Sequence, residues 1–337
     1  MYFDELSATM EALLQLGKGF LAADESTGTI GKRLATIGLE NTEENRRKYR
    51  LLLATTPGLG EFINGVILFE ETLSQTNEQG QTIPELFAAQ GIVPGIKVDK
   101  GIVPLAGTLD ENVTQGLDGL GERLEQYKKM GAKFAKWRNV YSISEATPSL
   151  TAVKAGAETL ARYAAICQSV GIVPIVEPEI LINGAHSIDA CADSSEIVLH
   201  ELYNSLFTHQ VALEFTILKP SMVTCGIDNA QFSTPEEIAS YTVNIFRNHV
   251  PAAVPSINFL SGGQSPIQAT VNLNAINSTG IQPWILSFSY GRGLQEDCLK
   301  TWLGKDENIK AAQEVLLHQA RLNSAAALGE YTKSTAE

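Results

Sequence analysis

Short apolar runs rich in β-branched residues recur along the chain, and a longer segment of helical character follows each of them. Their nearly continuous hydrophobicity is typical of parallel strands that are covered on both faces. We interpret eight runs as strands, at residues 19–24, 64–69, 94–99, 132–138, 172–178, 213–219, 256–261 and 283–289. Eight strands alternating with helices are the number that a closed (β/α)8 TIM barrel requires.

The segments between the strands carry start and stop signals for helices. Thr234 opens a Thr-Pro-Glu-Glu sequence, which combines an N-cap, a proline at the first helical position and a capping box. Asn41, with a glutamate three residues later, predicts a second N-cap. A third helix is expected over 148–170 and should end at Gly171.

We find no hairpin signals and no linker, so the pattern predicts an α/β fold and one barrel domain over residues 1–337. A short flexible C-terminal tail is expected from about residue 331. Periodicity alone leaves a doubly wound open sheet as the alternative. The polar residues therefore have to decide between the two.

The net charge of −13 disfavours nucleic acid and anionic membranes as partners. Four scattered cysteines without a C-x-x-C pair indicate free thiols in a reducing compartment. The N-terminal segment resembles an amphipathic helix rather than a signal peptide, and no apolar run is long enough to span a membrane. A cytoplasmic location is expected, or a plastid if a transit peptide has been removed.

Ionisable or phosphate-binding residues stand at the end of nearly every predicted strand. They are Asp24, Lys97, Asp99, Lys136, Arg138, Glu177, Glu179, Lys219, the Ser261-Gly262-Gly263 run, and Ser289 with Gly291 and Arg292. Any one of these charges could be a buried ion pair that only stabilises the barrel. Their shared place at the C-terminal ends of separate strands, where barrel active sites form, favours a catalytic site.

The lysines in this set suggest amine chemistry. A buried lysine that has lost its proton can attack a carbonyl group and form a Schiff base. Lys219 is the best candidate, because apolar residues precede it and Pro220 ends the strand there; Lys136 is the alternative. The glycine-containing loops after the last two strands, with Arg292, favour a phosphate ligand. The five histidines lack metal-ligand spacing, so no metal is predicted.

The segments LAADESTGTIGKRL, GIKVDKG, FAKWR, VEPEI, ILKPSMVT, LNAIN, FLSGGQS and FSYGR resemble, in order, the signature segments of class I fructose-bisphosphate aldolases. The resemblance implies cleavage of fructose 1,6-bisphosphate by a homotetramer that uses no cofactor beyond a covalent Schiff base. It makes Lys219 the nucleophile, Glu177 the general acid–base and Asp24 the acceptor of the C4 hydroxyl proton. Lys136, Arg138, Glu179 and Lys97 complete the charge network.

The resemblance also implies binding sites for the two phosphates of a sugar bisphosphate. Ser26 and Arg33 would lie near the C6 phosphate. The remaining binding residues are Leu260, Ser261, Gly262, Gly263, Ser289, Gly291 and Arg292, among which Ser261, Gly262, Gly291 and Arg292 would hold the C1 phosphate.

Two features depart from the family pattern. Relatives usually end in a tyrosine that assists protonation of the enamine, whereas the last tyrosine here is Tyr331, so we expect that protonation to limit turnover. Ser221 and Cys225 stand where asparagine and proline are usual, with an effect expected on packing more than on chemistry. A preference for sedoheptulose bisphosphate, another Schiff-base barrel enzyme and a non-catalytic scaffold are the competing hypotheses.

Overall fold

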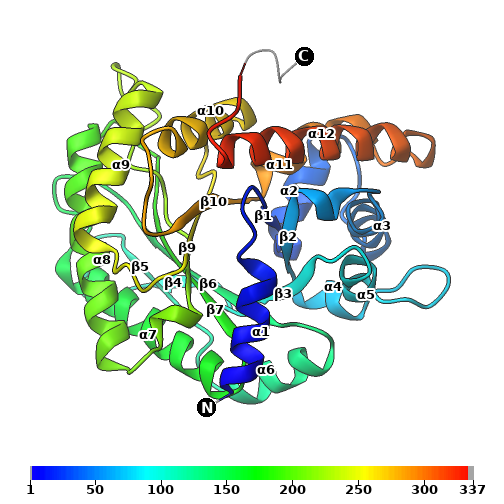
Figure 1. The fold of residues 1–337 in the computed structure, drawn as a ribbon, viewed down its shortest axis with the longest axis horizontal. Coiled ribbons are helices and arrows are strands. Elements are labelled where there is room, and N and C mark those ends of the chain that lie inside the picture. The colour runs from blue at the N-terminus through cyan, green and yellow to red at the C-terminus, as the bar shows by residue number, and fades with distance from the viewer. Residues whose placement is uncertain (1, 333–337) are drawn as a thin grey trace.

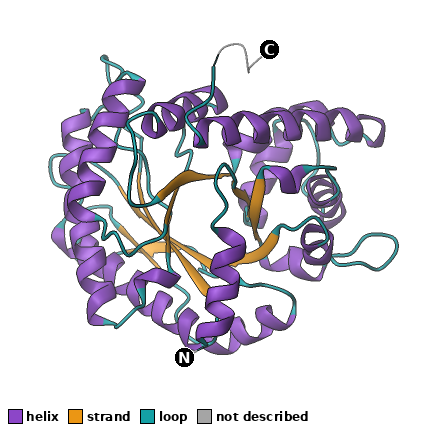
Figure 2. Cartoon of the chain, viewed as in Figure 1, coloured by secondary structure: helices purple, strands orange, loops and turns teal. Residues whose placement is uncertain are grey.

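The computed structural model describes residues 2–332, and in this part of the chain eight parallel strands close into a barrel surrounded by helices (Figures 1 and 2). Around the barrel the strands follow the order β1, β10, β9, β8, β7, β6, β3, β2. Their bounds are β1 Gly19–Ala23, β2 Ile63–Leu68, β3 Val93–Lys97, β6 Phe134–Tyr141, β7 Val173–Ile180, β8 Ile217–Leu218, β9 Ser256–Phe259 and β10 Ile285–Tyr290. Each of the eight predicted strands is confirmed, and the open sheet is excluded.

The helices form the outer layer. Their bounds are α1 Phe3–Leu13, α2 Thr27–Ala35, α3 Glu43–Ala54, α4 Glu70–Ser74, α5 Ile83–Ala88, α6 Leu120–Lys129, α7 Leu150–Ser169, α8 Ile188–Thr208, α9 Pro235–His249, α10 Pro266–Asn277, α11 Arg292–Trp302 and α12 Ile309–Ala327. The short 3-10 helices are η1 Leu59–Glu61, η2 Leu213–Phe215 and η3 Asp306–Asn308. Within residues 2–332, no helix is long and apolar enough to cross a membrane.

Most of the helix boundaries follow the capping signals. The capping box at Thr234 is present, and Gly171 adopts a φ of +75° directly after Val170, the C-cap residue of helix α7. The N-cap prediction at Asn41 is wrong by one residue, because Thr42 caps helix α3. The Asn41 side chain is engaged elsewhere: its amide donates to the Thr27 carbonyl and its oxygen accepts from Arg46.

Two segments differ from the predicted pattern of strands. Only Ile217–Leu218 of the run 213–219 is a strand, and its first half forms helix η2. The expectation of no hairpins is also wrong, since β4 (Ile102–Pro104) and β5 (Asn112–Thr114) pair antiparallel. Each has three residues and β4 is largely exposed, so neither shows the alternation by which a strand is recognised in sequence.

Helix α1 packs against the N-terminal ends of the barrel strands (Figure 1). Its buried residues Leu6, Met10 and Leu13 belong to one apolar cluster with Phe20, Ala22, Ile67, Phe134, Val173, Ile175 and Ile217. A second, larger cluster lies between the strands and the outer helices. These apolar layers leave the C-terminal end of the barrel as the place where polar side chains gather.

The remaining predictions concern the cysteines and the C-terminus. All four cysteines are free thiols and are buried. The predicted tail from about residue 331 falls mainly on residues 333–337, which lie outside the described residues. Tyr331 itself packs against the larger core cluster, and its backbone N–H donates to the side chain of Asn274.

Candidate active site

All of the site residues predicted from the sequence line one cavity of about 1010 Å³. The strands β1, β3, β6, β7 and β8 contribute the charged groups, and the loops after β9 and β10 contribute the glycines. In parallel strands of a closed barrel the C-terminal ends meet on one side, so residues far apart in sequence converge there. The cavity therefore brings the predicted residues together.

Lys219 follows directly after the two-residue strand β8. Its backbone N–H donates to the Val176 carbonyl at 2.8 Å, which extends the β7–β8 ladder by one bond. The side-chain Nζ is buried and lies 3.4 Å from Oε1 of Glu177. The candidate nucleophile is thus held in a site with little access to water, beside a carboxylate.

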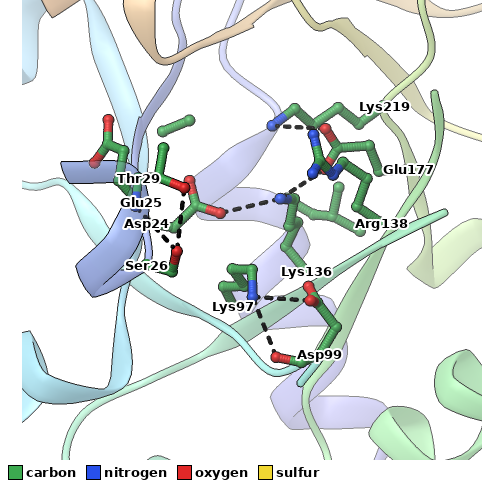
Figure 3. Close-up of polar contacts among 12 residues, drawn as sticks. Asp24, Glu25, Ser26, Thr29, Lys97, Asp99, Lys136, Arg138, Glu177 and Lys219 are labelled. Carbon is green, nitrogen blue, oxygen red and sulfur yellow. Dashed lines mark hydrogen bonds and ion pairs between the residues drawn. The ribbon is translucent and has the colours of Figure 1, made fainter. Parts of the chain in front are cut away.

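Lys136 links two carboxylates from different strands. Its Nζ lies 3.0 Å from Oδ2 of Asp24 and 2.9 Å from Oε2 of Glu177. In Figure 3, Lys136 points toward Asp24 on one side and toward Glu177 and Lys219 on the other. One amino group therefore connects the ends of β1, β6 and β7 in a continuous network of charges.

Two further ion pairs flank this network. Arg138 donates to Oε2 of Glu179 at 2.7 Å, and Nζ of Lys97 lies 2.8 Å from Oδ1 of Asp99. Arg138 is two residues beyond Lys136 on β6 and therefore points to the same side of the strand. The period of two in a strand explains why the lysine and the arginine reach one cavity.

Burial and the neighbouring charge of Lys136 lower the pKa of Lys219, although the Glu177 carboxylate acts in the opposite direction. For Lys136 itself, burial lowers the pKa, but the carboxylates of Asp24 and Glu177 outweigh it and the net pKa is raised. The pKa values of the two lysines are therefore shifted in opposite directions. Lys136 is held as a cation, while Lys219 reaches its neutral, nucleophilic form more readily.

The pKa values of the three carboxylates also shift in different directions. Burial alone would raise the pKa of Asp24 and of Glu177, but nearby lysines outweigh it and the net pKa of each is lowered. Glu179 has Arg138 as its main partner, and there burial dominates, so its pKa is raised. Asp24 and Glu177 are thus ionised at the centre of the site, whereas Glu179, at its side, has a higher pKa.

The loops after β9 and β10 expose backbone rather than side chains. Gly262 and Gly263 have φ values of +43° and +89°, which side-chain-bearing residues rarely adopt. Gly291 precedes helix α11, whose first residue is Arg292. A glycine turn beside a helix N-terminus offers N–H groups and a favourable dipole to an anion.

Arg33 lies at the same end of the cavity. Its Nη2 is 3.7 Å from the position that a Cβ would take on Gly291. The guanidinium therefore borders the loop expected to hold the C1 phosphate, whereas the sequence had associated Arg33 with the C6 phosphate. Ser26 caps helix α2 through its hydroxyl, which accepts from the Thr29 N–H and contacts the Thr29 hydroxyl (Figure 3).

A buried carboxylate that the sequence pattern does not single out supports this corner of the cavity. Glu25 pairs with Arg33 on one side and with Arg50 at 2.5 Å on the other. Gln295 donates to Glu25 at 3.2 Å and to the Ala22 carbonyl at 2.7 Å. An arginine at position 50 beside three leucines was the available signal, because a charge on an apolar helix face needs a buried partner.

Other residues at the rim were not singled out from the sequence. Thr29, Lys32, Lys100, Glu70, Glu296 and Lys300 also line the cavity. Lys100 and Lys300 pair with Glu70 and Glu296 respectively. Within residues 2–332, no three histidine, cysteine, aspartate or glutamate side chains are grouped in a way that could hold a metal ion.

Comparisons with known proteins agree with this geometry. The family described as "Fructose-bisphosphate aldolase class-I" matches residues 5–337. The chain is 55% identical to "Fructose-bisphosphate aldolase 1, chloroplastic" of Arabidopsis thaliana, over 98% of this chain and 82% of that protein. It is 54% identical to "Fructose-bisphosphate aldolase 5, cytosolic" of the same plant, over 98% and 92%.

A solved structure shows the same fold. The fructose-bisphosphate aldolase from Plasmodium falciparum, crystallised with TRAP and a small-molecule inhibitor, superposes with a TM-score of 0.97. It is 52% identical in sequence, and the match covers 98% of this chain and 96% of that one. On the family match, the identities and the fold, the chain belongs to the class I fructose-bisphosphate aldolases.

Proposed function

We propose that the protein cleaves fructose 1,6-bisphosphate reversibly into dihydroxyacetone phosphate and glyceraldehyde 3-phosphate, with Lys219 as the nucleophile. The observation that carries the assignment is the buried Nζ of Lys219 at 3.4 Å from Glu177, beside the cation of Lys136. This arrangement lowers the pKa of one lysine and gives it an adjacent proton carrier.

In the first step the neutral amine of Lys219 attacks C2 of the ketose and forms a carbinolamine. Glu177, which is ionised in the free enzyme, first takes the proton that Lys219 loses on becoming a neutral amine. It then delivers this proton to the C2 hydroxyl, which leaves as water and gives the iminium. Its position beside Lys219 suits that transfer. Lys136, on the other oxygen of the same carboxylate, holds Glu177 in place and favours its ionised form, which is regenerated when the proton is delivered.

In the second step the bond between C3 and C4 breaks. Asp24 takes the proton of the C4 hydroxyl, the C4 oxygen becomes the aldehyde, and the bonding electrons move toward the iminium to give an enamine. The pKa of Asp24 is lowered, so it is ionised and able to accept a proton at neutral pH. Protonation of the enamine at C3 and hydrolysis then return the amine of Lys219.

The covalent imine supplies the electron sink, and the proposal includes no other cofactor. Two cationic regions of the cavity are suited to the two phosphates. We assign the Ser261–Gly263 loop, with Gly291, Arg292 and Arg33, to one phosphate, and Ser26 with Lys97, which line the same cavity, to the other. On a protein of net charge −13 these are local exceptions, and they favour a substrate with an anion at each end.

Quaternary structure and cellular role are parts of the same proposal. We expect a homotetramer, on the family resemblance, and analytical ultracentrifugation tests it. The similar proteins include chloroplastic and cytosolic aldolases, so a role in glycolysis and gluconeogenesis or in the Calvin cycle fits the family. The cytoplasmic location remains a prediction.

The test is chemical trapping. The protein is incubated with dihydroxyacetone phosphate and borohydride in the presence of EDTA, and the adduct is located by peptide mass spectrometry. A reduced adduct on Lys219 with loss of activity is expected. An adduct on Lys136 would mean that the roles of the two lysines are exchanged. If no adduct forms and EDTA abolishes the activity, the Schiff-base mechanism is refuted. Rates on sedoheptulose 1,7-bisphosphate, measured in parallel, define the substrate preference.

A further inference from the structure

The ladder between β7 and β8 is short at the place where the proposed nucleophile is attached. The parallel register pairs only Ile175 with Ile217 and Val176 with Leu218. By contrast, β6 and β7 are in register over eight residue pairs, from Phe134 with Val173 to Tyr141 with Ile180. The backbone that carries Lys219 is therefore held by few strand hydrogen bonds.

Proline interrupts that ladder immediately after the lysine. The N–H of Lys219 donates to Val176, but Pro220 has no N–H with which to continue the pairing. On the other side of β8, the carbonyl of Pro220 accepts from the Leu260 N–H at 3.0 Å. Contact with β9 is thus kept past the lysine, while the backbone ladder to β7 stops.

The side chain of Ser221 restores the link to β7. Its hydroxyl accepts from the backbone N–H of Ile180 at 3.0 Å and donates to the carbonyl of the same residue at 2.9 Å. One hydroxyl group thereby satisfies both backbone groups of the last residue of β7. A single bond would leave rotation free, whereas this two-point contact holds the two chains in one relative position.

The contact joins the two segments that carry the reacting groups. Ser221 is two residues after Lys219, and Ile180 comes directly after Glu179 and three residues after Glu177. The distance that matters for catalysis, 3.4 Å between Nζ of Lys219 and Oε1 of Glu177, lies between them. A shift of about 1 Å in such a pair can cost on the order of 100-fold in rate.

We propose that Ser221 is a positioning residue that sets the Lys219–Glu177 geometry through its two hydrogen bonds to Ile180. The inference rests on the proposed function, because it assumes that this lysine and this glutamate react with the substrate. It assigns a mechanical role to one of the two positions at which the chain departs from the family pattern. The asparagine usual there also carries one donor group and one acceptor oxygen.

The experiment compares three variants at this position. Ser221→Ala removes both bonds, Ser221→Asn replaces the hydroxyl by an amide with donor and acceptor, and Ser221→Thr keeps the hydroxyl. Ser195→Ala is the matched control, since the Ser195 hydroxyl is also buried but donates within helix α8 to the Cys191 carbonyl. For each variant kcat, KM for fructose 1,6-bisphosphate, the pH profile of borohydride trapping and the melting temperature are measured.

Ser221→Ala is expected to lower kcat about tenfold, with KM changed less than about twofold because the phosphate loops are untouched. The limb of its trapping profile that reports the amine of Lys219 should also shift. Ser221→Asn and Ser221→Thr should restore most of kcat, and Ser195→Ala should change only the melting temperature. If Ser221→Ala does not fold, the Asn and Thr variants still decide, because both are expected to be active.

Two outcomes would overturn the inference. One is a folded Ser221→Ala enzyme with the kcat and pH profile of the wild type. Another is equal loss in the Ala, Asn and Thr variants, since shape rather than hydrogen bonding would then matter. The proposed function fails separately, if the wild-type protein gives no adduct on Lys219.

Discussion

The two ends of the barrel are built from the same strands and have opposite chemistry. On β6, Phe134 lies in the apolar cluster beneath helix α1, while Lys136 and Arg138 line the cavity. On β7, Val173 and Ile175 belong to the apolar cluster, and Glu177 follows at the next inward position. Since every second residue of a strand faces the interior, one step of two residues leads from the apolar cluster to the charged cavity.

The difference shows how the free energy lost by burying charges at one end is offset by apolar packing at the other. Burying an ionised carboxylate or ammonium group costs several kcal/mol, and pairing offsets this cost only in part, so the charged end alone would destabilise the fold. At the opposite end, side chains such as Leu6, Phe20 and Phe134 are fully buried and contribute stability. Helix α1 closes that end, so the barrel is a packed frame with one open, reactive face.

The largest effect is expected from removing Lys219, the proposed nucleophile. Lys219→Ala should lower kcat/KM by at least about 10⁴-fold, because alanine has no amine with which to form the imine and Lys136 is held as a cation. Its melting temperature should stay close to that of the wild type or rise, since a buried ionisable group is removed while Glu177 keeps Lys136 as its partner. Steady-state kinetics and calorimetry measure both. A variant with more than a tenth of the wild-type activity would contradict the assignment.

Lys136→Met tests whether the charge of Lys136 lowers the pKa of Lys219. Loss of this cation should lower kcat by about 10² to 10³-fold, since Asp24 and Glu177 lose their common partner. The charge of Lys136 lowers the pKa of Lys219, so its removal should move the trapping profile toward higher pH. Trapping rates between pH 6 and about pH 10 provide the measurement. A shift toward lower pH would refute the electrostatic account.

Phe134→Ala probes the opposite end of the same strand. Phe134 is fully buried and contacts Phe20 edge-on at 5.3 Å between ring centroids. The free energy of unfolding should fall by about 3–5 kcal/mol, while kcat and KM of the folded enzyme stay within about twofold of the wild type. Urea denaturation and kinetics well below the melting temperature test this separation. A large fall in kcat would show that the two ends are coupled.

Asp24→Asn should make stability less sensitive to acid, by about 1 kcal/mol. The pKa of Asp24 is lowered in the folded state, so its ionisation stabilises the protein above the ordinary value of 3.8. That contribution is lost as the pH falls below this value toward the folded pKa. The difference between the urea midpoints at pH 5 and at about pH 3 should therefore be smaller in the variant. An unchanged difference would mean that Asp24 does not contribute to acid denaturation.

Much of the fold was predictable because its signals are local. Apolar runs bounded by turns predicted each barrel strand, and the capping box at Thr234 predicted the start of helix α9. The hairpin of β4 and β5 was missed because three-residue strands show no periodicity. Asn41 was taken for an N-cap because the sequence cannot show that its side chain bonds to Thr27 and Arg46.

By itself the sequence determined which side chains stand at the strand ends, and hence which groups the cavity would hold. Only the tertiary structure decided which charged side chains form ion pairs: Lys136 with Asp24 and Glu177, and Arg138 with Glu179. Such pairs join positions tens of residues apart, and their distances depend on strand register and barrel closure. Ser221 illustrates the point. In the sequence it is only a small polar residue in place of the usual asparagine. The structure places it beside Ile180, where its hydroxyl forms two hydrogen bonds with the backbone of that residue.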